Sequence, residues 1–315
     1  MERRPIRKQI AGMSLEALRD QYRYDLFEDY LPFWEAHGID HELGGFMCAM
    51  DHDGTYVNTE KRMWYQGRGL WVYAFLYNQF GDDRFLEVAK KARDFVVRHG
   101  RDGNGDWVAS LDRKGNVTAP ADGIGYTGLF VAEGLQEYAR ATNDGASMDL
   151  ALESLWRAVE IIEDPNRDMQ QGYAPRSYPG MRMQGYEMVK IVMMTQLLPH
   201  VSDPKLEALA AGAVDAVIHR FWNPEYQLNN EVLNPRLERP DDENEDFVYL
   251  GHAIETMWML LREAMRLKDR SLFDLVAERL KRHLEVAWDD VYGGFFRSLR
   301  VKSNTFVLDK VLWLQ

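Results

Sequence analysis

The stretch Trp64–Phe80, WYQGRGLWVYAFLYNQF, is typical of a helix that has no polar side. At 100° per residue one of its faces is apolar and consists of Leu70, Tyr73, Ala74 and Tyr77. The opposite face sets one cation among aromatic rings and consists of Trp64, Arg68, Trp71 and Phe75. A helix on a protein surface normally keeps one polar face, so the pattern predicts a helix buried on both sides.

Arg68 is the one charged residue of this stretch. A buried arginine needs an anionic or oxygen-rich partner, and indoles such as Trp64 and Trp71 can lie against the C–H faces of a sugar ring. The stretch therefore predicts an arginine that binds sugar oxygens between aromatic walls. The same residues also fit an ordinary helical core, in which the guanidinium of Arg68 would be hydrogen-bonded by carboxylates or backbone carbonyls.

The composition predicts a folded cytoplasmic protein. Of the 315 residues, 46% are hydrophobic, which is enough for a large core, and the formal net charge of −12 argues against nucleic acid or an anionic membrane as a partner. Cys48 is the only cysteine, so no internal disulfide is expected, and a reducing compartment fits. We find no secretory signal and no run of 18 apolar residues, so we expect no membrane span.

Helices are expected in pairs along the sequence, after a first helix over Ser14–Trp34. The more aromatic member of each pair is expected at Trp64–Phe80, Asp122–Thr142, Gln184–Leu198 and Glu245–Leu267. The more polar member is expected at Asp82–Arg98, Ser147–Ile162, Pro204–Arg220 and Ser271–Val286. A final helix is expected to begin near Thr305.

Turn segments between the pairs repeat at intervals of about 60 residues, which is the strongest sign of organisation in this sequence. They recur at Gly44, Gly105, Gly172, Tyr226 and Gly293. Two of them nearly match, DHELGGF at 40–46 and DDVYGGF at 289–295. Helix hairpins with short β-turns or hairpins at one end, repeated in this way, predict an all-α fold, an α/α toroid with an inner and an outer ring of helices around a central cavity.

Residues 1–315 are expected to form a single toroid domain with about five of six helix-hairpin repeats. The same spacing would put a sixth turn near position 355, and FVLDKVLWLQ ends the sequence without a cap or a polar tail. The chain is therefore predicted to be a truncated toroid that lacks about the last helix pair. An open edge of this kind would favour a homodimer or aggregation.

His252 and Glu255 are the best candidates for chemistry. They lie three residues apart on one face of the helix DFVYLGHAIETMWMLLREAM, with apolar neighbours on that face. A histidine beside a carboxylate in a cavity suits proton transfer near neutral pH, and the glutamate would orient the imidazole or hydrogen-bond a substrate hydroxyl. A His–Glu pair on an exposed face is the alternative.

The remaining histidines are expected to be structural or solvated, because they lie at turns, at helix ends or on outer helices: His37, His41, His52, His99, His200, His219 and His283. The sequence contains no HExxH, paired-cysteine, P-loop, GxGxxG or Gly-x-Ser-x-Gly motif. We therefore predict no metal and no cofactor.

Several long stretches resemble the N-acylglucosamine 2-epimerase family, which also includes cellobiose 2-epimerases and mannose isomerases. They are FWEAHGIDHELGGF (33–46), WYQGRGLW (64–71), FVAEGLQEYARATND (130–144), GHAIETMWML (251–260) and WDDVYGGFF (288–296). The resemblance runs in register from about residue 30 to the C-terminus. It implies an (α/α)6 barrel, which agrees with the toroid predicted from the repeat.

The resemblance implies a sugar isomerase that transfers a proton at the carbon next to the carbonyl of an N-acylhexosamine or related aldose. His252 matches the family's first catalytic histidine and Glu255 the nearby acid, while Arg68 matches the arginine that would hold the substrate oxygen and stabilise the cis-enediolate. Reprotonation at C2 on the other face gives the epimer, and reprotonation at C1 gives the ketose. The remaining substrate-binding residues that the resemblance implies are Trp64, Trp71, Tyr126, Glu133 and Met188.

One part of the family pattern has no counterpart here. The family's second catalytic histidine lies in a C-terminal segment, and nothing in residues 1–315 matches it. A non-catalytic sugar-binding homologue is therefore one alternative. The other is an α/α-toroid glycoside hydrolase or lyase with paired carboxylates, for instance Asp122 with Glu133 or Glu187.

Overall fold

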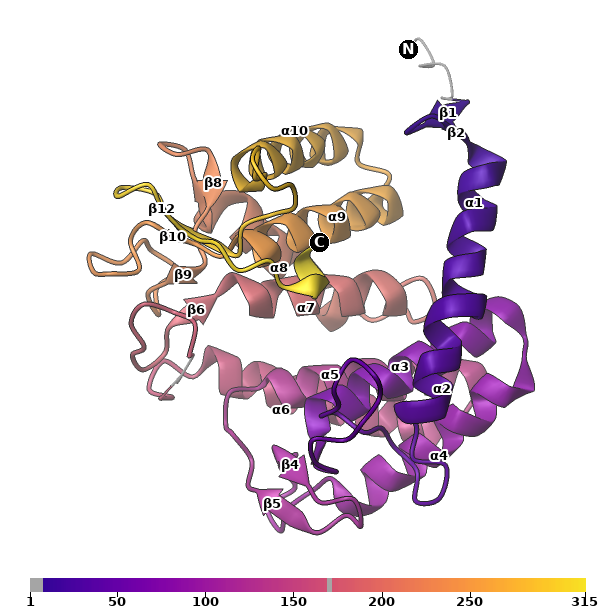
Figure 1. Cartoon of the computed structure of the whole chain (residues 1–315). Helices are drawn as coiled ribbons and strands as arrows, with labels where there is room; N and C mark the ends of the chain where they lie inside the picture. Colours follow the sequence, from indigo (N-terminus) through magenta and orange to yellow (C-terminus); the bar gives the residue numbers. More distant parts are fainter. Residues whose placement is uncertain (1–7, 169–171) are drawn as a thin grey trace. The chain divides into compact units, whose positions relative to one another are not determined.

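A computed structural model describes residues 8–168 and 172–315, and in this part of the chain helix pairs alternate with short β-hairpins (Figure 1). The chain folds into two compact units. The first consists of Met1–Ala121 with Glu137–Ser147, and the second of Asp122–Gln136 with Met148–Gln315. That both belong to a single toroid domain, one that lacks about the last helix pair, stays a prediction.

The first unit begins with a strand pair and a long helix, and continues with one helix hairpin and one small sheet. Its strands are β1 (Gln9–Ile10), β2 (Met13–Ser14), β3 (Lys61–Arg62), β4 (Ser110–Leu111) and β5 (Val117–Ala119), with the sheet order β3-β4-β5. Its helices are α1 (Leu15–Tyr24), a π-helical turn (Asp25–Tyr30), α2 (Leu31–His37), α3 (Met63–Phe80) and α4 (Asp83–His99).

The second unit contains the other helix pairs. Helices α5 (Tyr126–Thr142) and α6 (Gly145–Glu163) each have residues in both units. The remaining helices are α7 (Gln184–Leu197), α8 (Pro204–Asp215) with a π-helical turn (Ala216–Arg220), α9 (Leu250–Leu267), α10 (Arg270–Ala287) and a 3₁₀ turn (Leu312–Leu314). The strands are β6 (Arg182–Met183), β7 (Trp222–Asn223), β8 (Leu228–Asn229), β9 (Val232–Leu233), β10 (Phe247–Val248), β11 (Ser298–Arg300) and β12 (Thr305–Val307).

The first, more aromatic helix of each pair is the one expected in the inner ring, the second is the one expected in the outer ring, and the two kinds begin in different ways. Three of the outer helices are capped by their own sequence, because the side chains of Asp82, Asp203 and Asp269 accept backbone N–H groups of α4, α8 and α10. Three inner helices follow two-residue strands, with one residue between strand and helix in the case of α9, and have no side-chain cap. The first N–H of each instead donates to a carbonyl of the hairpin that follows its pair, from Met63 to Ala109, Gln184 to Glu231, and Leu250 to Arg297. Hairpins therefore lie at the N-terminal ends of the inner helices (Figure 1).

The two similar turns noticed in the sequence belong to two copies of a longer module. Residues 40–66 and 289–315 have equal length, and counterparts lie 249 positions apart from Asp40 and Asp289 to Gln66 and Gln315. Gly44–Gly45 and Gly293–Gly294 all have positive φ, a conformation that favours glycine. In each copy the aspartate N–H donates to the second glycine's carbonyl at 2.9 Å.

A glutamine closes each copy of the module. The side chain of Gln66 accepts from the N–H of Phe46 (2.7 Å) and donates to its carbonyl (2.8 Å). Gln315 forms the same two bonds with Phe295, at 2.8 and 3.1 Å. The shared signature is K-x-x-W-x-Q, at residues 61–66 and 310–315, so Trp313 is the counterpart of Trp64.

A lysine neutralises the turn aspartate in each copy. Lys61 Nζ lies 2.9 Å from Asp40 Oδ2 with both side chains fully buried, and Arg113 also donates to Asp40. Burial opposes the charge on Asp40, yet the bonds from Arg113 and Lys61 hold its pKa well below the usual range. Lys310 Nζ lies 2.5 Å from Asp289 Oδ2, but the side chain of Lys310 remains 28% exposed.

Most of the predicted helices are confirmed to within a few residues, and three expectations are wrong. The helix expected from Asp122 begins at Tyr126, because Asp122 and the positive-φ residues Gly123 and Gly125 form a turn. The helix expected from Glu245 begins at Leu250, after β10. The helix expected from Thr305 is instead β12, whose β-branched and aromatic residues pair with β11.

The expectation that α3 is buried on both sides is wrong too. One face is buried and includes Leu70, Tyr73 and Ala74, and α3 packs on α4. Arg68 is exposed, and Trp64 and Trp71 are half-buried. Among the described residues, no helix combines the length and hydrophobicity that a membrane span requires.

Candidate active site

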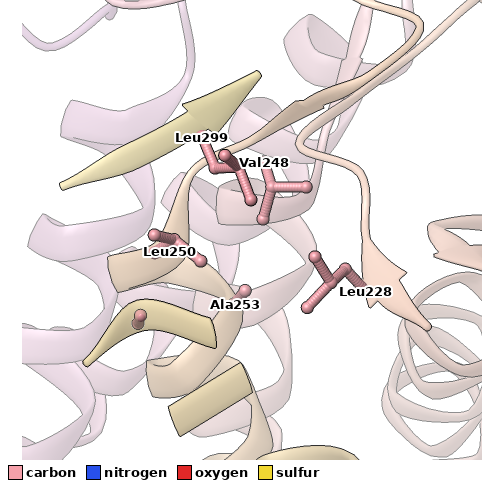
Figure 2. Close-up of a cluster of buried hydrophobic side chains, with 6 residues drawn as sticks. Leu228, Val248, Leu250, Ala253 and Leu299 are labelled. Carbon is pink, nitrogen blue, oxygen red and sulfur yellow. The ribbon is translucent and has the colours of Figure 1, made fainter. Parts of the chain in front are cut away.

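His252 lies in the first turn of α9, next to a core that fixes this end of the helix. Leu250 and Ala253 belong to a buried cluster with Leu228, Val248 and Leu299 from the strands (Figure 2). Since successive helical residues are 100° apart, His252 points away from the face that carries Leu250 and Ala253. Its side chain is 13% exposed, so the imidazole is largely shielded from solvent yet accessible at one edge.

Glu231, between β8 and β9, contacts the imidazole from another element. Its Oε1 lies 2.9 Å from Nδ1 of His252, and its side chain is 1% exposed. The same oxygen accepts from the hydroxyl of Tyr173 (3.1 Å) and more weakly from the N–H of Gly185 (3.4 Å). No described residue forms a hydrogen bond with Nε2 of His252.

Two opposing effects act on the pKa of His252. Burial lowers it, since a charged imidazole loses hydration. The Glu231 carboxylate raises it by charge and hydrogen bonding, and Glu255 adds a smaller increase, so the pKa lies above the ordinary value. A histidine with this balance is a stronger base than one in water.

Three aromatic rings surround the imidazole. Ring centroids of Tyr249, Tyr173 and Trp313 lie 4.8, 5.6 and 5.7 Å from that of His252. Trp313 stacks on Tyr249 at 6.0 Å and is 51% exposed. Gly251 allows this position, because a Cβ there would overlap the indole. A half-exposed indole beside a histidine is a surface on which an apolar sugar face can rest.

Tyr126 also lies close to His252. Both residues lie close to Gly185. A Cβ atom at this position would overlap the Tyr126 hydroxyl and Cε1 of His252. Glu133 and Met188 are buried in the same unit, at 8% and 5% exposure. The substrate-binding roles of Tyr126, Glu133 and Met188 stay predictions.

Glu255 does not occupy the orienting position that its spacing predicted. Glu231 takes the place at Nδ1, and Glu255 acts on His252 through its charge from one turn along α9. Arg68, Trp64 and Trp71 belong to the first unit and His252 to the second. Their arrangement around His252 stays a prediction.

Two carboxylates of the hydrolase alternative have structural partners. Asp122 accepts from the N–H of Ile124 and from the hydroxyl of Thr127. Glu187 forms an ion pair with Lys190 at 2.8 Å, and Arg182 lies 3.7 Å away. In the described residues, no group of three or more His, Cys, Asp or Glu side chains has an arrangement that could hold a metal ion.

The sequence profile of the N-acylglucosamine 2-epimerase (GlcNAc 2-epimerase) family matches residues 44–315. The chain belongs to this family. Its fold class is accordingly the α/α toroid predicted from the repeat, and relatives in the family named as 2-epimerases are enzymes of the isomerase class.

Individual epimerases are similar to the chain over most of its length. N-acylglucosamine 2-epimerase of Bos taurus is 25% identical over 303 residues, which is 90% of this chain and 68% of the relative. Cellobiose 2-epimerase of Dictyoglomus turgidum is 25% identical, over 87% of this chain and 72% of the relative. The chain spans about two thirds of the length of the mammalian epimerases that it matches.

A solved structure shares the fold. Cellobiose 2-epimerase from Bacillus thermoamylovorans superposes with a TM-score of 0.80 at 19% identity, covering 95% of this chain and 79% of that one. At this identity the likeness concerns the fold.

Reasoning from the sequence missed four residues beside His252, of which Tyr249 lies three positions before it at helical spacing. Trp313 had a signal, because the K-x-x-W-x-Q signature repeats that of Trp64. Glu231 and Tyr173 had none, since they lie 21 and 79 positions from His252 in segments with no helical spacing to it.

Proposed function

We propose that this member of the epimerase family transfers a proton at C2 of an open-chain aldose, an N-acylhexosamine or a related sugar. The observation that supports this most directly is His252, a nearly buried histidine with a raised pKa. Its Nδ1 is engaged by Glu231, while among the described residues none engages Nε2. A base of this kind suits abstraction of a weakly acidic C–H proton.

In the proposed mechanism Nε2 of His252 takes the C2 proton, and a cis-enediolate forms. Returning the proton to C1 on the same face gives the ketose, a transfer that His252 can perform alone. Epimerisation needs a proton donor on the opposite face of C2. Arg68 would stabilise the enediolate charge, and Trp64 and Trp71 would form walls of the sugar site.

The glycoside hydrolase alternative receives no support from the carboxylates. That reaction needs a protonated acid and a second carboxylate across the scissile bond. Glu187 is held between two cations, and Asp122 is engaged by the turn before α5. A cytoplasmic location and a homodimer likewise remain predictions.

The test is hydrogen exchange at C2, followed by proton NMR in D2O with N-acetylmannosamine, mannose and cellobiose. We expect the C2–H signal of at least one sugar to disappear with the wild-type chain, and roughly 100-fold more slowly with His252→Asn. His219→Asn is the matched control, because the His219 side chain is 66% exposed and should leave the rate unchanged.

Exchange that persists at the wild-type rate in His252→Asn would exclude His252 as the base. Sugar binding without exchange in the wild-type chain would favour the non-catalytic homologue. Release of reducing sugar from a glycan would favour a hydrolase.

A further inference from the structure

Glu231 is a buried carboxylate with an unusual set of partners. Its side chain is 1% exposed, and in the described part of the chain no lysine or arginine forms an ion pair with it. All three groups that approach Oε1 are donors or can be: the Tyr173 hydroxyl, the Gly185 N–H and Nδ1 of His252. A buried carboxylate without a permanent cation is costly unless hydrogen bonds or a titratable cation compensate it.

The backbone at Glu231 is fixed from two sides. Its N–H donates to the carbonyl of Phe247 in β10, and its carbonyl accepts the N–H of Gln184 at the start of α7. The residue is thus tied to the strands that lead into both α7 and α9. A side chain on so constrained a backbone holds its direction, which is what an orienting group requires.

The contact at Nδ1 determines which nitrogen of neutral His252 carries the proton. A carboxylate accepts hydrogen bonds and cannot donate them, so Nδ1 must be the protonated nitrogen. Nε2 then has a free lone pair. After Nε2 has taken a proton, the imidazolium charge lies 2.9 Å from the Glu231 carboxylate, where the attraction is strong because both groups are shielded from water.

We propose that Glu231 is the positioning residue that holds His252 as its Nδ1–H tautomer and stabilises the imidazolium formed when Nε2 takes the C2 proton. The proposal rests on the proposed function for the identity of that proton. The step is balanced, because the C2–H bond breaks as the Nε2–H bond forms, its electron pair passes into the enediolate, and a proton is later returned to carbon. Glu255, the carboxylate that the helical spacing singled out, then has a lesser effect on His252, through its charge.

Other titratable groups lie beside His252 or beside the residues around it, and they are part of the expected response to pH. They are Tyr173 from the loop before β6, Tyr126 from α5, Tyr186 from α7, Glu255 from α9 itself, and Tyr249 with Arg297. Of the described side chains, Glu231 is the one that forms a hydrogen bond with the imidazole, and none of these other groups does.

The experiment is ¹⁵N NMR of histidine-labelled protein without sugar, with the His252 signals assigned by their loss in His252→Asn. In the wild-type chain we expect a protonated Nδ1 and an unprotonated Nε2 at high pH, with a pKa above the ordinary value for histidine. In Glu231→Gln the pKa of His252 should fall, because the charge and the hydrogen bond that raise it are lost, and some Nε2–H tautomer should appear. Glu238→Gln is the matched control, an exposed glutamate after β9 that should change neither.

Kinetics supply the second readout. Glu231→Gln should lower kcat for C2 exchange by roughly 10- to 100-fold, as the loss of a hydrogen-bond partner that orients a histidine typically does, with KM changed by less than about threefold. If Glu231→Gln does not fold, Tyr173→Phe removes only one donor to Oε1. In this variant the Glu231 carboxylate should bind the imidazolium more strongly and raise the pKa of His252.

An unchanged tautomer and pKa in Glu231→Gln, or no pKa change in Tyr173→Phe, would overturn the proposal. The NMR readout needs no substrate, so it separates this proposal from the proposed function. The expected tautomer and pKa changes, found in a chain that exchanges no sugar, would support the role of Glu231 and count against the proposed reaction.

Discussion

Gly185 shows how closely the residues around His252 are packed. A Cβ at this position would overlap the Tyr126 hydroxyl and lie 2.9 Å from Cε1 of His252. We predict that Gly185→Ala shifts the imidazole and lowers the rate of C2 exchange by roughly 100-fold, since displacements near 1 Å at a reacting centre have effects of this size. The rate is measured by NMR in D2O.

Gly212→Ala in α8 is the matched control for a glycine replaced within a helix. A Cβ there meets nothing within 4 Å, so we expect an unchanged exchange rate and a gain of about 0.5–1 kcal/mol in the free energy of unfolding. Equal exchange rates in the wild-type chain and Gly185→Ala would show that the site tolerates the displacement.

Single residues of the site could be predicted only where helical spacing connects them. His252 and Glu255 share one face of one helix, so a sequence pattern brings them together. Glu231 reaches His252 because β9 pairs with β6 and Glu231 bonds to Phe247, contacts between strands of two residues each. Elements so short carry almost no periodic signal, and their pairing cannot be read from the sequence.

At the scale of elements, the two copies of the turn module form a matched pair for measuring a buried charge. Asp40→Asn leaves Lys61 charged in a site with no exposure, so we predict a loss of about 3–5 kcal/mol in the free energy of unfolding. Asp289→Asn should lose about 1–2 kcal/mol, because Lys310 is 28% exposed and can reach water. Urea denaturation of both variants gives the comparison.

Asparagine keeps the oxygen that accepts the turn N–H groups of residues 42–43 and 291–292, so each variant removes the charge and leaves these turn bonds in place; the larger loss in Asp40→Asn includes the ion pair with Arg113. Equal losses in the two variants would mean that burial of the lysine has no influence on the strength of the pair.

Element positions were largely predictable, and the errors have identifiable physical causes. Outer helices such as α4, α8 and α10 carry aspartate caps and polar faces, and their predicted starts agree with the structure to within a residue. The starts of α5 and α9 were placed too early because turns and strands precede them without a change in hydrophobicity. Arg68 was expected to be buried because a helix rich in aromatic residues suggests burial on all sides, whereas only one face is buried.

The whole molecule should become less stable in acid because of His283. This side chain is buried, Nε2 accepts the N–H of Asn229 (3.0 Å), and Nδ1 lies 2.8 Å from the carbonyl of Arg279. Burial lowers its pKa to about 4. The folded state thus keeps His283 neutral while the unfolded chain binds a proton below about pH 6.5.

The stabilisation is therefore fully present above pH 6.5 and is lost as the pH falls to 4, by about 3 kcal/mol for a shift of this size. We predict that His283→Gln, though less stable at pH 7, loses correspondingly less stability than the wild-type chain between pH 7 and 4.5. Urea denaturation at both pH values measures the difference, with His219→Asn as the control. If His283→Gln and the wild-type chain lose the same free energy of unfolding between pH 7 and 4.5, groups other than His283 cause the loss.

The fold class could be predicted at this scale because repetition amplifies a weak signal. Each turn segment alone is ambiguous, but five of them at similar spacing, with helix pairs between, leave few architectures. Gly44 and Gly105, one interval apart, even share a φ of +84°.

The two kinds of helix start also affect the order in which helices can form while the chain is being synthesised. An outer helix carries its aspartate cap with it and can begin to form as soon as its own residues leave the ribosome. An inner helix lacks its first hydrogen bond until a hairpin nearly fifty residues downstream has been made. For α9 that partner is the carbonyl of Arg297, so the helix that carries His252 is secured at its first residue only after residue 297 has been made.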